Sequence, residues 1–529
     1  MMKSITHLFA ICLLTCSLQS VAQNPSIRYF EHEIPKKANK ELQFFAFYIN
    51  QGVTSNFYPS SEFLRGQVVG RLFGKNTTTT SDTAMSVYIE QRIIPFFIYQ
   101  PNLFNGRAIL RASFEIDWTW GDVAYGTGGN LGGAVSADQV NIQTQNIELE
   151  LIPWRGWTVN LGLQRMFDTP YNPYRTLFDK MTQTGYRLAY FGTDAVGISF
   201  RHDRDFARYK IGYYKFYEND IYRDDDVNMF EAIAETAVNN KWKLGGSIYY
   251  VRDRSEGKGG VSILGQGLNS LLNEYNGTFK FKFGADPYKA DVAWLGAFFS
   301  RNTDYMLDRL HLTGFFNYNL GSASIRKPTG WEKGADIGGF AANFKTVYRY
   351  GQTLDDHVKL DLIYASGDDN GINDKKYSGV MTGNMWGSPA SIFISSGAYI
   401  LMPHGNVVNR YTPAVADMSN MGYGLSAATL TFARSVIPHR FTVKVGGATA
   451  FSNSAPLAGG SYIGSEANAA LIYNIGTFMS LELHGAYMWL GDFYDSADER
   501  YGAAVNGGTY GLRPVNPWTT FIVYKWLLF

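Results

Sequence analysis

The chain has 529 residues, including 55 Gly, and 16% of its residues are aromatic while only 18% are charged, for a net charge of +1. Average soluble chains carry roughly 7% Gly and about 25% charged residues, and this mixture of Gly and aromatic residues is typical of strands rather than helices. The charge balance excludes nucleic acid as a partner, because binding it needs a basic surface. The two cysteines, Cys12 and Cys16, lie in the first apolar stretch, which excludes a disulfide framework, a zinc cluster or a cysteine nucleophile in the remainder.

The first 22 residues have the pattern of a secretory signal peptide. Lys3 is followed by an apolar run and then by small residues that suit cleavage after Ala22. The run is shorter than the roughly 20 residues of a spanning helix. A lipoprotein site at Cys16 stays open as an alternative, although Thr15 is a poor residue before a lipidated cysteine. Since no later window has about 18 uninterrupted apolar residues, the exported chain is either soluble or an outer-membrane β-barrel.

Alternation of polar and apolar residues favours the barrel. After Gly106, for example, Arg107 and Arg111 fall on one face of a segment while Leu110 and Phe114 fall on the other. A period of two is typical of strands with two different environments. Several runs reach the 9–11 or so residues that a tilted strand needs to cross a bilayer, whereas soluble strands average about five or six. We therefore expect an all-β fold, a transmembrane antiparallel β-barrel.

Nineteen segments carry the strand pattern: 62–73, 84–97, 106–118, 140–151, 157–166, 195–201, 206–217, 227–237, 241–248, 278–283, 290–300, 309–320, 337–350, 357–365, 425–435, 441–445, 466–473, 479–489 and 518–529. Single-chain barrels normally have an even number of strands, so we expect about 18, within 16 to 20. The odd count places an error between Arg301 and Lys327, where either two segments form one strand or a strand near 322–326 is missing.

The connections are of two kinds. Those at 153–156, 239–240 and 438–439 are short, whereas those at 121–139 and 367–424 are long. Short periplasmic turns and long extracellular loops are typical of a membrane barrel. The expected barrel covers 62–529. Before it, residues 23–61 form a small N-terminal periplasmic, plug-like segment or a first strand at 42–48, too short for the plug domain of a gated receptor.

The last strand is rich in aromatic residues and ends on a terminal Phe. It resembles the C-terminal signal that the barrel-assembly machinery recognises, carried here by Trp518, Phe521, Tyr524, Trp526 and Phe529. With the strand count, the long Gly/Asp/Asn-rich loops and the run Tyr-Ala-Ser-Gly-Asp-Asp at 364–369, the chain resembles the alginate-export porins of Gram-negative bacteria, in a style similar to Bacteroidota members. The resemblance implies an outer-membrane passive channel of 18 strands, in contact with lipid and lipopolysaccharide, whose basic lumen guides a polyanionic sugar.

Charged side chains on one face of alternating strands should face water, because a charge on the lipid face costs about 2–4 kcal/mol at the midplane. The expected pore-lining residues are Arg92, Arg107, Arg111, Glu115, Asp117, Arg201, Arg208, Lys210, Lys243, Lys280, Lys282, Lys359 and Lys444. Further acidic residues share the inward face, among them Glu90, Glu148, Glu150, Asp361 and Glu482. Such a mixed lumen is typical of a general porin rather than a dedicated alginate exporter. The alternative for about half of these charges is pairing across neighbouring strands to hold the wall together.

Other chemistry has weaker support. Asp368, Asp369, Asn370 and Asp374 could offer oxygen ligands to Ca²⁺, but the EF-hand spacing and its distal Glu are missing, so a solvated turn is favoured. We expect no enzyme activity and no cofactor: His484 lies near Glu482, yet no serine can be assigned to the pair as a nucleophile.

The leading hypothesis is a porin-like channel for hydrophilic solutes, including anionic or saccharide ones. The rival is a closed scaffold barrel in an envelope or secretion complex, with its long loops docking partner proteins. A transporter for hydrophobic ligands would require an apolar lumen, and the charged inward face argues against that function.

Overall fold

The computed structural model describes residues 34–59, 72–73, 78–120, 141–165, 194–217, 221, 223–256, 286–302, 307–381, 397–402, 413–415, 418–496 and 513–528. Regular structure in these ranges is almost entirely β. The helical pieces found there are three short 3-10 turns, η2 (Asn102–Phe104), η4 (Asn420–Gly422) and η5 (Asp492–Asp495). No helix in the described ranges has the length and apolar character needed to span a bilayer.

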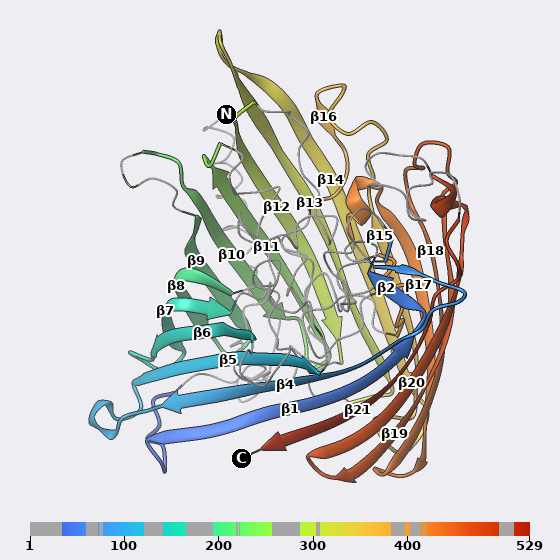
Figure 1. Ribbon diagram of the computed structural model, residues 1–529. Helices are drawn as coiled ribbons and strands as arrows, with labels where there is room; N and C mark the ends of the chain where they lie inside the picture. The colour runs from blue at the N-terminus through green and yellow to red at the C-terminus, as the bar shows by residue number, and fades with distance from the viewer. Residues whose placement is uncertain are drawn as a thin grey trace.

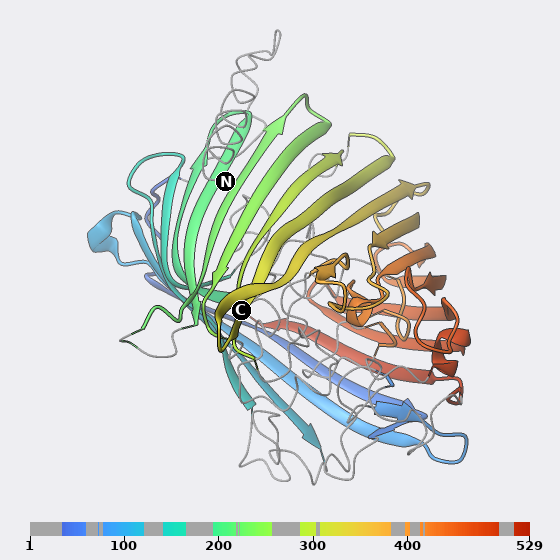
Figure 2. The same ribbon diagram turned by 90° about the horizontal axis from the view of Figure 1, so that it is seen from above.

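Long strands follow one another around a closed wall (Figures 1 and 2). Their bounds are β1 Leu42–Ser55, β4 Ser86–Tyr99, β5 Ala108–Trp120, β6 Asn141–Leu151, β7 Trp157–Arg165, β8 Asp194–Asp203, β9 Ala207–Tyr217, β10 Val227–Ala237, β11 Trp242–Asp253, β12 Tyr288–Arg301, β13 Leu310–Lys327, β14 Gly330–Arg349, β15 His357–Ala365, β17 Leu425–Ile437, β18 Phe441–Phe451, β19 Tyr462–Gly476, β20 Met479–Leu490 and β21 Trp518–Leu528. The ring closes because β1 pairs antiparallel with both β4 and β21.

The sheet has 19 strands in all. One of them is the two-residue β16 (Lys376–Tyr377), which pairs in parallel with β14. Without β16, the described residues form a ring of 18 antiparallel strands, which confirms the expected all-β barrel and its strand number. A small separate hairpin, β2 (Phe57–Pro59) with β3 (Thr78–Thr80), lies in the connection between β1 and β4.

The strand number is right, although individual strands differ from the expectation. The segments 62–73 and 278–283 lie outside the described residues, apart from 72–73. The ring is continuous in the described residues at both positions, because β1 pairs directly with β4 and β11 pairs directly with β12. The first strand of the ring is instead β1, which includes the 42–48 segment.

The expected error between Arg301 and Lys327 was misplaced, since β13 and β14 are simply long. They span 18 and 20 residues and are joined by Pro328 and Thr329 alone. Residues 322–326 are therefore the end of β13. This tight turn lies at the end of the barrel where most other connections are long, so the alternation of short turns and long loops is locally broken, and the hairpin projects at the top of Figure 1.

The two ends of the barrel differ in their connections. One end, called the terminus end below, holds the start of β1, the end of β21 and short turns such as 152–156 and 438–440. At the other, the loop end, lie longer connections such as 56–85 and 366–424. The short turns expected from the sequence thus fall together at one end, as in membrane barrels.

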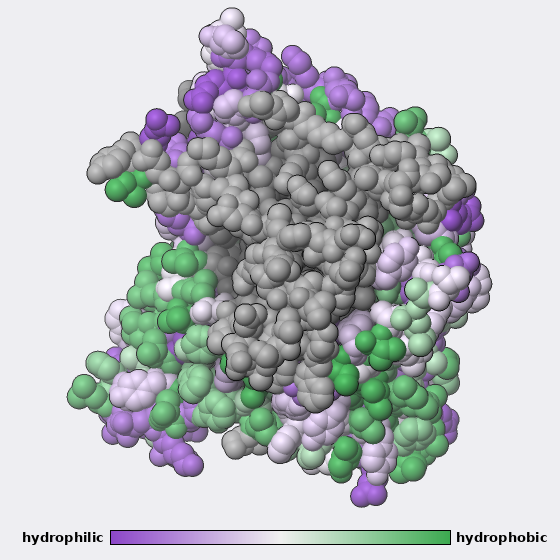
Figure 3. All heavy atoms as spheres, viewed as in Figure 1, coloured by the Kyte–Doolittle hydropathy of each residue, from purple (hydrophilic) through white to green (hydrophobic). Residues whose placement is uncertain are grey.

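The outer surface carries the apolar half of each alternating strand. Figure 3 shows hydrophobic residues spread over the outer wall and hydrophilic ones at the projecting hairpin. Outward, solvent-exposed apolar side chains come from strands all around the ring, among them Leu110, Phe200, Ile211, Leu244, Phe316, Phe344, Leu430, Val445, Leu471, Leu483 and Ile522. Since exposing this much apolar surface to water is unfavourable, the outer wall is suited to contact with lipid.

At the terminus end, the turn between β14 and β15 is organised around the buried Asp356. Its carboxylate accepts hydrogen bonds from the backbone N–H of Thr353 (3.0 Å) and of Ser435 at the end of β17 (2.9 Å). Led by the bond from Thr353, these donors hold the pKa of the Asp356 carboxyl below its usual value of 3.8.

Because the folded-state pKa is depressed, the stabilisation by Asp356 is fully present above pH 3.8 and is lost as the pH falls through the lower folded-state value. We expect Asp356→Asn to lower the thermal stability at neutral pH. The variant should also lose less stability than the unmodified protein when the pH is lowered. Melting followed by the electrophoretic mobility of folded and unfolded barrel across the acid range checks this. An unchanged acid response in the variant would contradict the role of Asp356.

Candidate functional site

The inner faces of β5 to β8 are joined by a network of buried charges centred on Glu150, which is completely shielded from solvent. Its carboxylate accepts hydrogen bonds from Arg111 on β5 and from Arg201 on β8, each at 2.9 Å. Asn160 on β7 donates to Glu148 at 2.7 Å and to Glu150 at 3.1 Å. The strand register brings these side chains together, because Arg111 lies opposite Glu148 and Glu150 lies opposite Asn160.

The network continues along the wall as separate pairs. Lys210 on β9 contacts Glu231 on β10 at 2.7 Å, and the Tyr214 hydroxyl donates to the same carboxylate at 2.6 Å. Arg208 lies 3.2 Å from Asp203 across the β8–β9 pair. These charges are paired side by side on the inner wall, so they stabilise the wall as well as making it polar.

A second polar stretch lies on β14, β15 and β18. Asp361 is approached by the Lys345 ammonium at 3.3 Å and accepts a hydrogen bond from Asn343 at 2.6 Å. Lys359 lies two residues from Asp361 on the same inner face, and Lys444 occupies the inner face of β18, whose outward neighbour Val445 is exposed. Lysines therefore outnumber the carboxylate at this point of the wall.

The structure brings together six of the residues expected in the pore and leaves others apart. Buried on the inner wall between β4 and β11 are Arg92, Arg111, Arg201, Arg208, Lys210 and Lys243. Arg107 is exposed in the β4–β5 turn and donates to the carbonyl of Pro153, so it joins neither network. Lys280, Lys282 and the side chains of Glu115 and Asp117 lie outside the described residues.

The connection between β15 and β17 enters the lumen from the loop end. Its described parts, 366–381, 397–402, 413–415 and 418–424, are called the inserted connection below. On one side, the indole N–H of Trp294 on β12 donates to the carbonyl of Met381 at 2.8 Å. Asn319 on β13 accepts a hydrogen bond from the Met381 N–H at 3.0 Å. Both wall residues are almost fully buried on inward faces.

A second contact is made by Glu466 of β19, whose side chain binds backbone N–H groups of the inserted connection. The buried carboxylate accepts hydrogen bonds from the N–H groups of Tyr399 (2.7 Å), Ile400 (2.9 Å) and Leu401 (2.7 Å). Asn468 supplies a further donor at 2.7 Å. A carboxylate that collects three adjacent backbone N–H groups is a strong, charge-assisted anchor.

The inserted connection touches opposite walls of the barrel. In ring order β12 is nine strands from β1 in either direction. Met381 is held by β12 and β13, whereas Tyr399 packs against the apolar cluster formed by β1 and β21, with its ring 5.8 Å from that of Phe521. One connection therefore reaches both sides of the barrel and narrows the lumen.

Part of the inner wall is apolar, contrary to the charged inward face expected from the sequence. Met229, Val251, Val292 and Trp294 on β10 to β12 are buried in one cluster with Val380, Met381, Ile400 and Leu401 of the inserted connection. The reason is packing: this side of the lumen is covered by protein, so its side chains gain from burial. The inward charges of these strands, Glu231 on β10 and Lys243 on β11, lie nearer the terminus end than Met229 and Val251.

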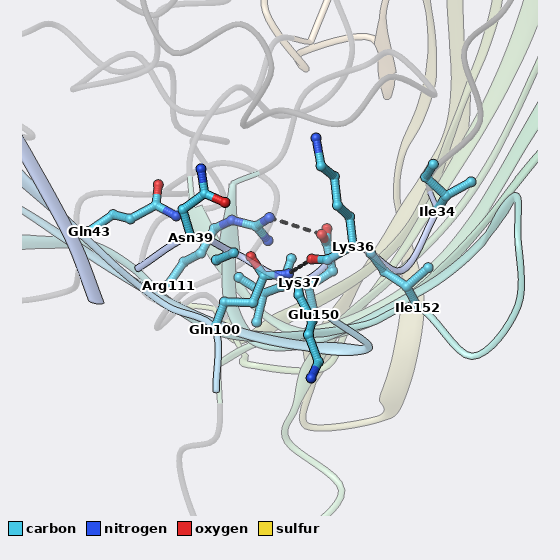
Figure 4. A pocket seen from close by; sticks show the side chains of 11 residues that line it. Ile34, Lys36, Lys37, Asn39, Gln43, Gln100, Arg111, Glu150 and Ile152 are labelled. Atoms are coloured by element: carbon cyan, nitrogen blue, oxygen red, sulfur yellow. Dashed lines mark hydrogen bonds and ion pairs between the residues drawn. The ribbon is translucent and has the colours of Figure 1, made fainter. Parts of the chain in front are cut away.

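A cavity of about 340 Å³ opens beside the Arg111–Glu150 pair at the terminus end (Figure 4). Residues 34–41, called the strap below, precede β1 and form one side of it. The strap is tied to the β4–β5 turn, since Gln100 donates to the Lys36 carbonyl at 2.6 Å and the Asn102 N–H donates to the Glu41 carboxylate at 2.7 Å. Gly106, with φ of 78°, lets the strap approach, because a Cβ there would lie 2.4 Å from the Lys36 backbone.

The calcium candidate is not assembled as a metal site. Asp368 accepts hydrogen bonds from the N–H of Ser378 (2.8 Å) and of Asn370 (3.2 Å), and Asp374 accepts one from the N–H of Lys376. The described ranges hold no group of three His, Cys, Asp or Glu side chains arranged for a metal ion. These aspartates stabilise the turns of the inserted connection.

His484 and Glu482 are in contact, at 2.9 Å on the inner face of β20. Ser480 donates to Glu482 at 3.1 Å rather than to His484, and Lys525 lies 3.0 Å from the same carboxylate. The order of contacts puts the carboxylate, not the histidine, beside the hydroxyl. A nucleophile activated by an adjacent base is therefore not formed by these three residues.

The C-terminal strand, expected to carry an assembly signal, closes the ring. Tyr524 lies beside Tyr48 of β1, with ring centroids 6.3 Å apart, and Trp526 is exposed on the outer face. Phe521 points inward and stacks on His484 at 4.6 Å. Phe529 lies outside the described residues.

Glu466 was absent from the residues expected in the lumen. Alternation with Asn468 on β19 places it on the inward face, so a sequence signal existed. Its partners are backbone groups 65 to 67 residues away, and backbone N–H groups leave no side-chain pattern in a sequence.

No protein-family model and no curated protein matches the chain. Solved structures with a similar arrangement include the BenF-like porin from Pseudomonas fluorescens Pf-5 (TM-score 0.47, 10% identity, 92% of this chain and 98% of that one). Others are Acinetobacter baumannii OccAB4 (0.45, 9%, 95% and 99%) and Pseudomonas aeruginosa OccK11 (0.44, 10%, 92% and 96%).

Proposed function

We propose that the protein is a passive, porin-like channel for small hydrophilic solutes in the outer membrane of a Gram-negative bacterium. The observation that carries the proposal is the closed ring of 18 strands, apolar outside and with a charged inner sector. Barrels of 16 to 18 strands are wide enough to enclose an aqueous channel. The short-turn end then faces the periplasm, the long connections face outward, and the C-terminal strand is the part read by the assembly machinery.

The selectivity follows from the inserted connection and the charged inner wall. The inserted connection packs on β10 to β13 and β19 to β21, so the polar path for solutes runs beside β5 to β9. Arg111, Arg201, Lys210 and their carboxylate partners are paired and buried in this sector of the wall, so they make it polar, and a polar wall favours hydrophilic over apolar solutes. We propose small anionic or saccharide solutes as the cargo, with a preference for molecules that fit past the connection.

Liposome swelling tests the channel with solutes of graded size. Purified protein should let arabinose enter faster than sucrose, and sucrose faster than raffinose, because the inserted connection limits the free cross-section. Liposomes without protein, and liposomes with heat-unfolded protein, are the controls. Equal, background-level swelling for all three sugars would contradict an open path.

The second candidate, a closed scaffold barrel that docks envelope proteins, is favoured by the insertion itself. A lumen in which Met381 and Tyr399 are anchored on opposite walls could be sealed rather than narrowed. Purification in mild detergent separates the two functions: stoichiometric partner proteins together with absent swelling support the scaffold, whereas swelling by the isolated barrel supports the channel.

A further inference from the structure

We propose that the cavity under the strap is a binding subsite for a small polyhydroxy carboxylate at the periplasmic mouth of the channel. The assignment of the periplasmic side rests on the proposed function. The existence of the subsite rests on the cavity alone.

The strap is a fixed element. Besides the two hydrogen bonds already described, the Gln100 N–H donates to the Glu41 carbonyl at 2.7 Å. Gly106 adds a steric condition, because only a residue without Cβ leaves room for the Lys36 backbone at this point. Lys36, Lys37 and Asn39 are therefore presented from a held backbone, which lowers the entropic cost of using them to bind a solute.

The charge of the lining favours an anion. Lys36, Lys37 and Arg111 are its cations, and Glu150 is its one carboxylate. Glu150 is already engaged by Arg111 and by Arg201 from outside the cavity. In Figure 4 the Lys36 side chain extends on the same side of the strap as the Asn39 amide and the Arg111 guanidinium, while Lys37 leaves in the opposite direction. Lys36 is thus the cation best placed to meet a carboxylate.

The rest of the lining favours hydroxyl groups. Side-chain amides come from Asn39, Gln43 and Gln100, and an amide offers both donors and an acceptor to a hydroxyl. Ligand pockets usually measure roughly 300–1,000 Å³, so a cavity of about 340 Å³ has the size for a small molecule. A carboxylate joined to a short chain of hydroxyls satisfies the charge, the amides and the volume together.

Calorimetric titration of the full-length barrel in detergent tests the subsite. The probe is D-gluconate, and the matched neutral probe is sorbitol, in which a hydroxymethyl group replaces the carboxylate. We expect gluconate to bind and sorbitol not to. Lys36→Gln should weaken gluconate binding about tenfold, the effect of losing one hydrogen bond to a charged group.

Two variants separate a built site from general charge. Lys40→Gln removes a charge from the same strap outside the cavity lining and should leave gluconate binding unchanged. Gly106→Ala keeps every lysine but displaces the strap, so it should weaken gluconate binding. Equal binding of gluconate and sorbitol, or equal effects of Lys36→Gln and Lys40→Gln, would overturn the proposal.

The outcome is independent of the channel test. Gluconate binding without any liposome swelling would support the subsite while the channel function fails. Swelling by neutral sugars without gluconate binding would support the channel while the subsite fails.

Discussion

Replacing Glu466 with alanine is expected to raise the single-channel conductance and to make the current noisier. The substitution removes the acceptor of three backbone N–H groups in the inserted connection. Leaving a buried donor unsatisfied costs about 1–3 kcal/mol, so the connection loses several kcal/mol of anchorage at the β19 wall and samples positions away from it. A wider and fluctuating passage follows, and planar-bilayer recording measures both changes.

Glu231→Ala is the matched control for this experiment. It also removes a buried, inward carboxylate, but Glu231 is bonded to Lys210 and Tyr214 on a different sector of the wall. It should alter ion selectivity with little change in current noise. If the two variants behave alike, the conductance reports lumen charge alone and the inserted connection is not the element that narrows the channel.

Glu150→Ala is expected to destabilise the barrel by about 3–5 kcal/mol, the usual cost of leaving buried charges without their partner. Arg111 and Arg201 both lose the buried carboxylate that they share at 2.9 Å. Urea unfolding of the barrel in lipid vesicles gives the free energy of unfolding.

Two comparisons show whether the charge pairing is the cause. Glu332→Ala removes an exposed carboxylate on the projecting hairpin and should change stability by no more than about 0.5 kcal/mol. The double variant Glu150→Leu with Arg201→Met removes one buried carboxylate and one buried guanidinium. It should therefore recover part of the stability that Glu150→Ala loses. A double variant less stable than Glu150→Ala would argue against this explanation.

The wall of the barrel could be predicted because one physical rule governs it. On β8 and β11, the inward Arg201 and Lys243 alternate with the outward Phe200 and Leu244, and that contrast is visible in the sequence. The rule does not say which strands are neighbours: β11 pairs directly with β12, and the alternating 278–283 segment between them lies outside the described residues.

The contents of the lumen could be predicted only in part. Arg111, Arg201 and Lys210 are buried on the inner wall, but which charges meet depends on strand register, as between Arg111 and Glu148. The inserted connection was not predicted, since its contacts join Met381 to Trp294 and Tyr399 to Glu466 across 87 and 67 residues. Local alternation carries no information about such pairs, and it gave no warning that the inner face of β10 to β12 would be apolar.

Recording of the unmodified protein in a planar bilayer tests the central claim most directly. A channel of 18 strands narrowed by the inserted connection should insert in discrete, stepwise increments of conductance that stay open at low voltage. A protein that inserts into the bilayer, as shown by its protection from added protease, yet gives no stepwise current would contradict the channel and identify a sealed barrel instead.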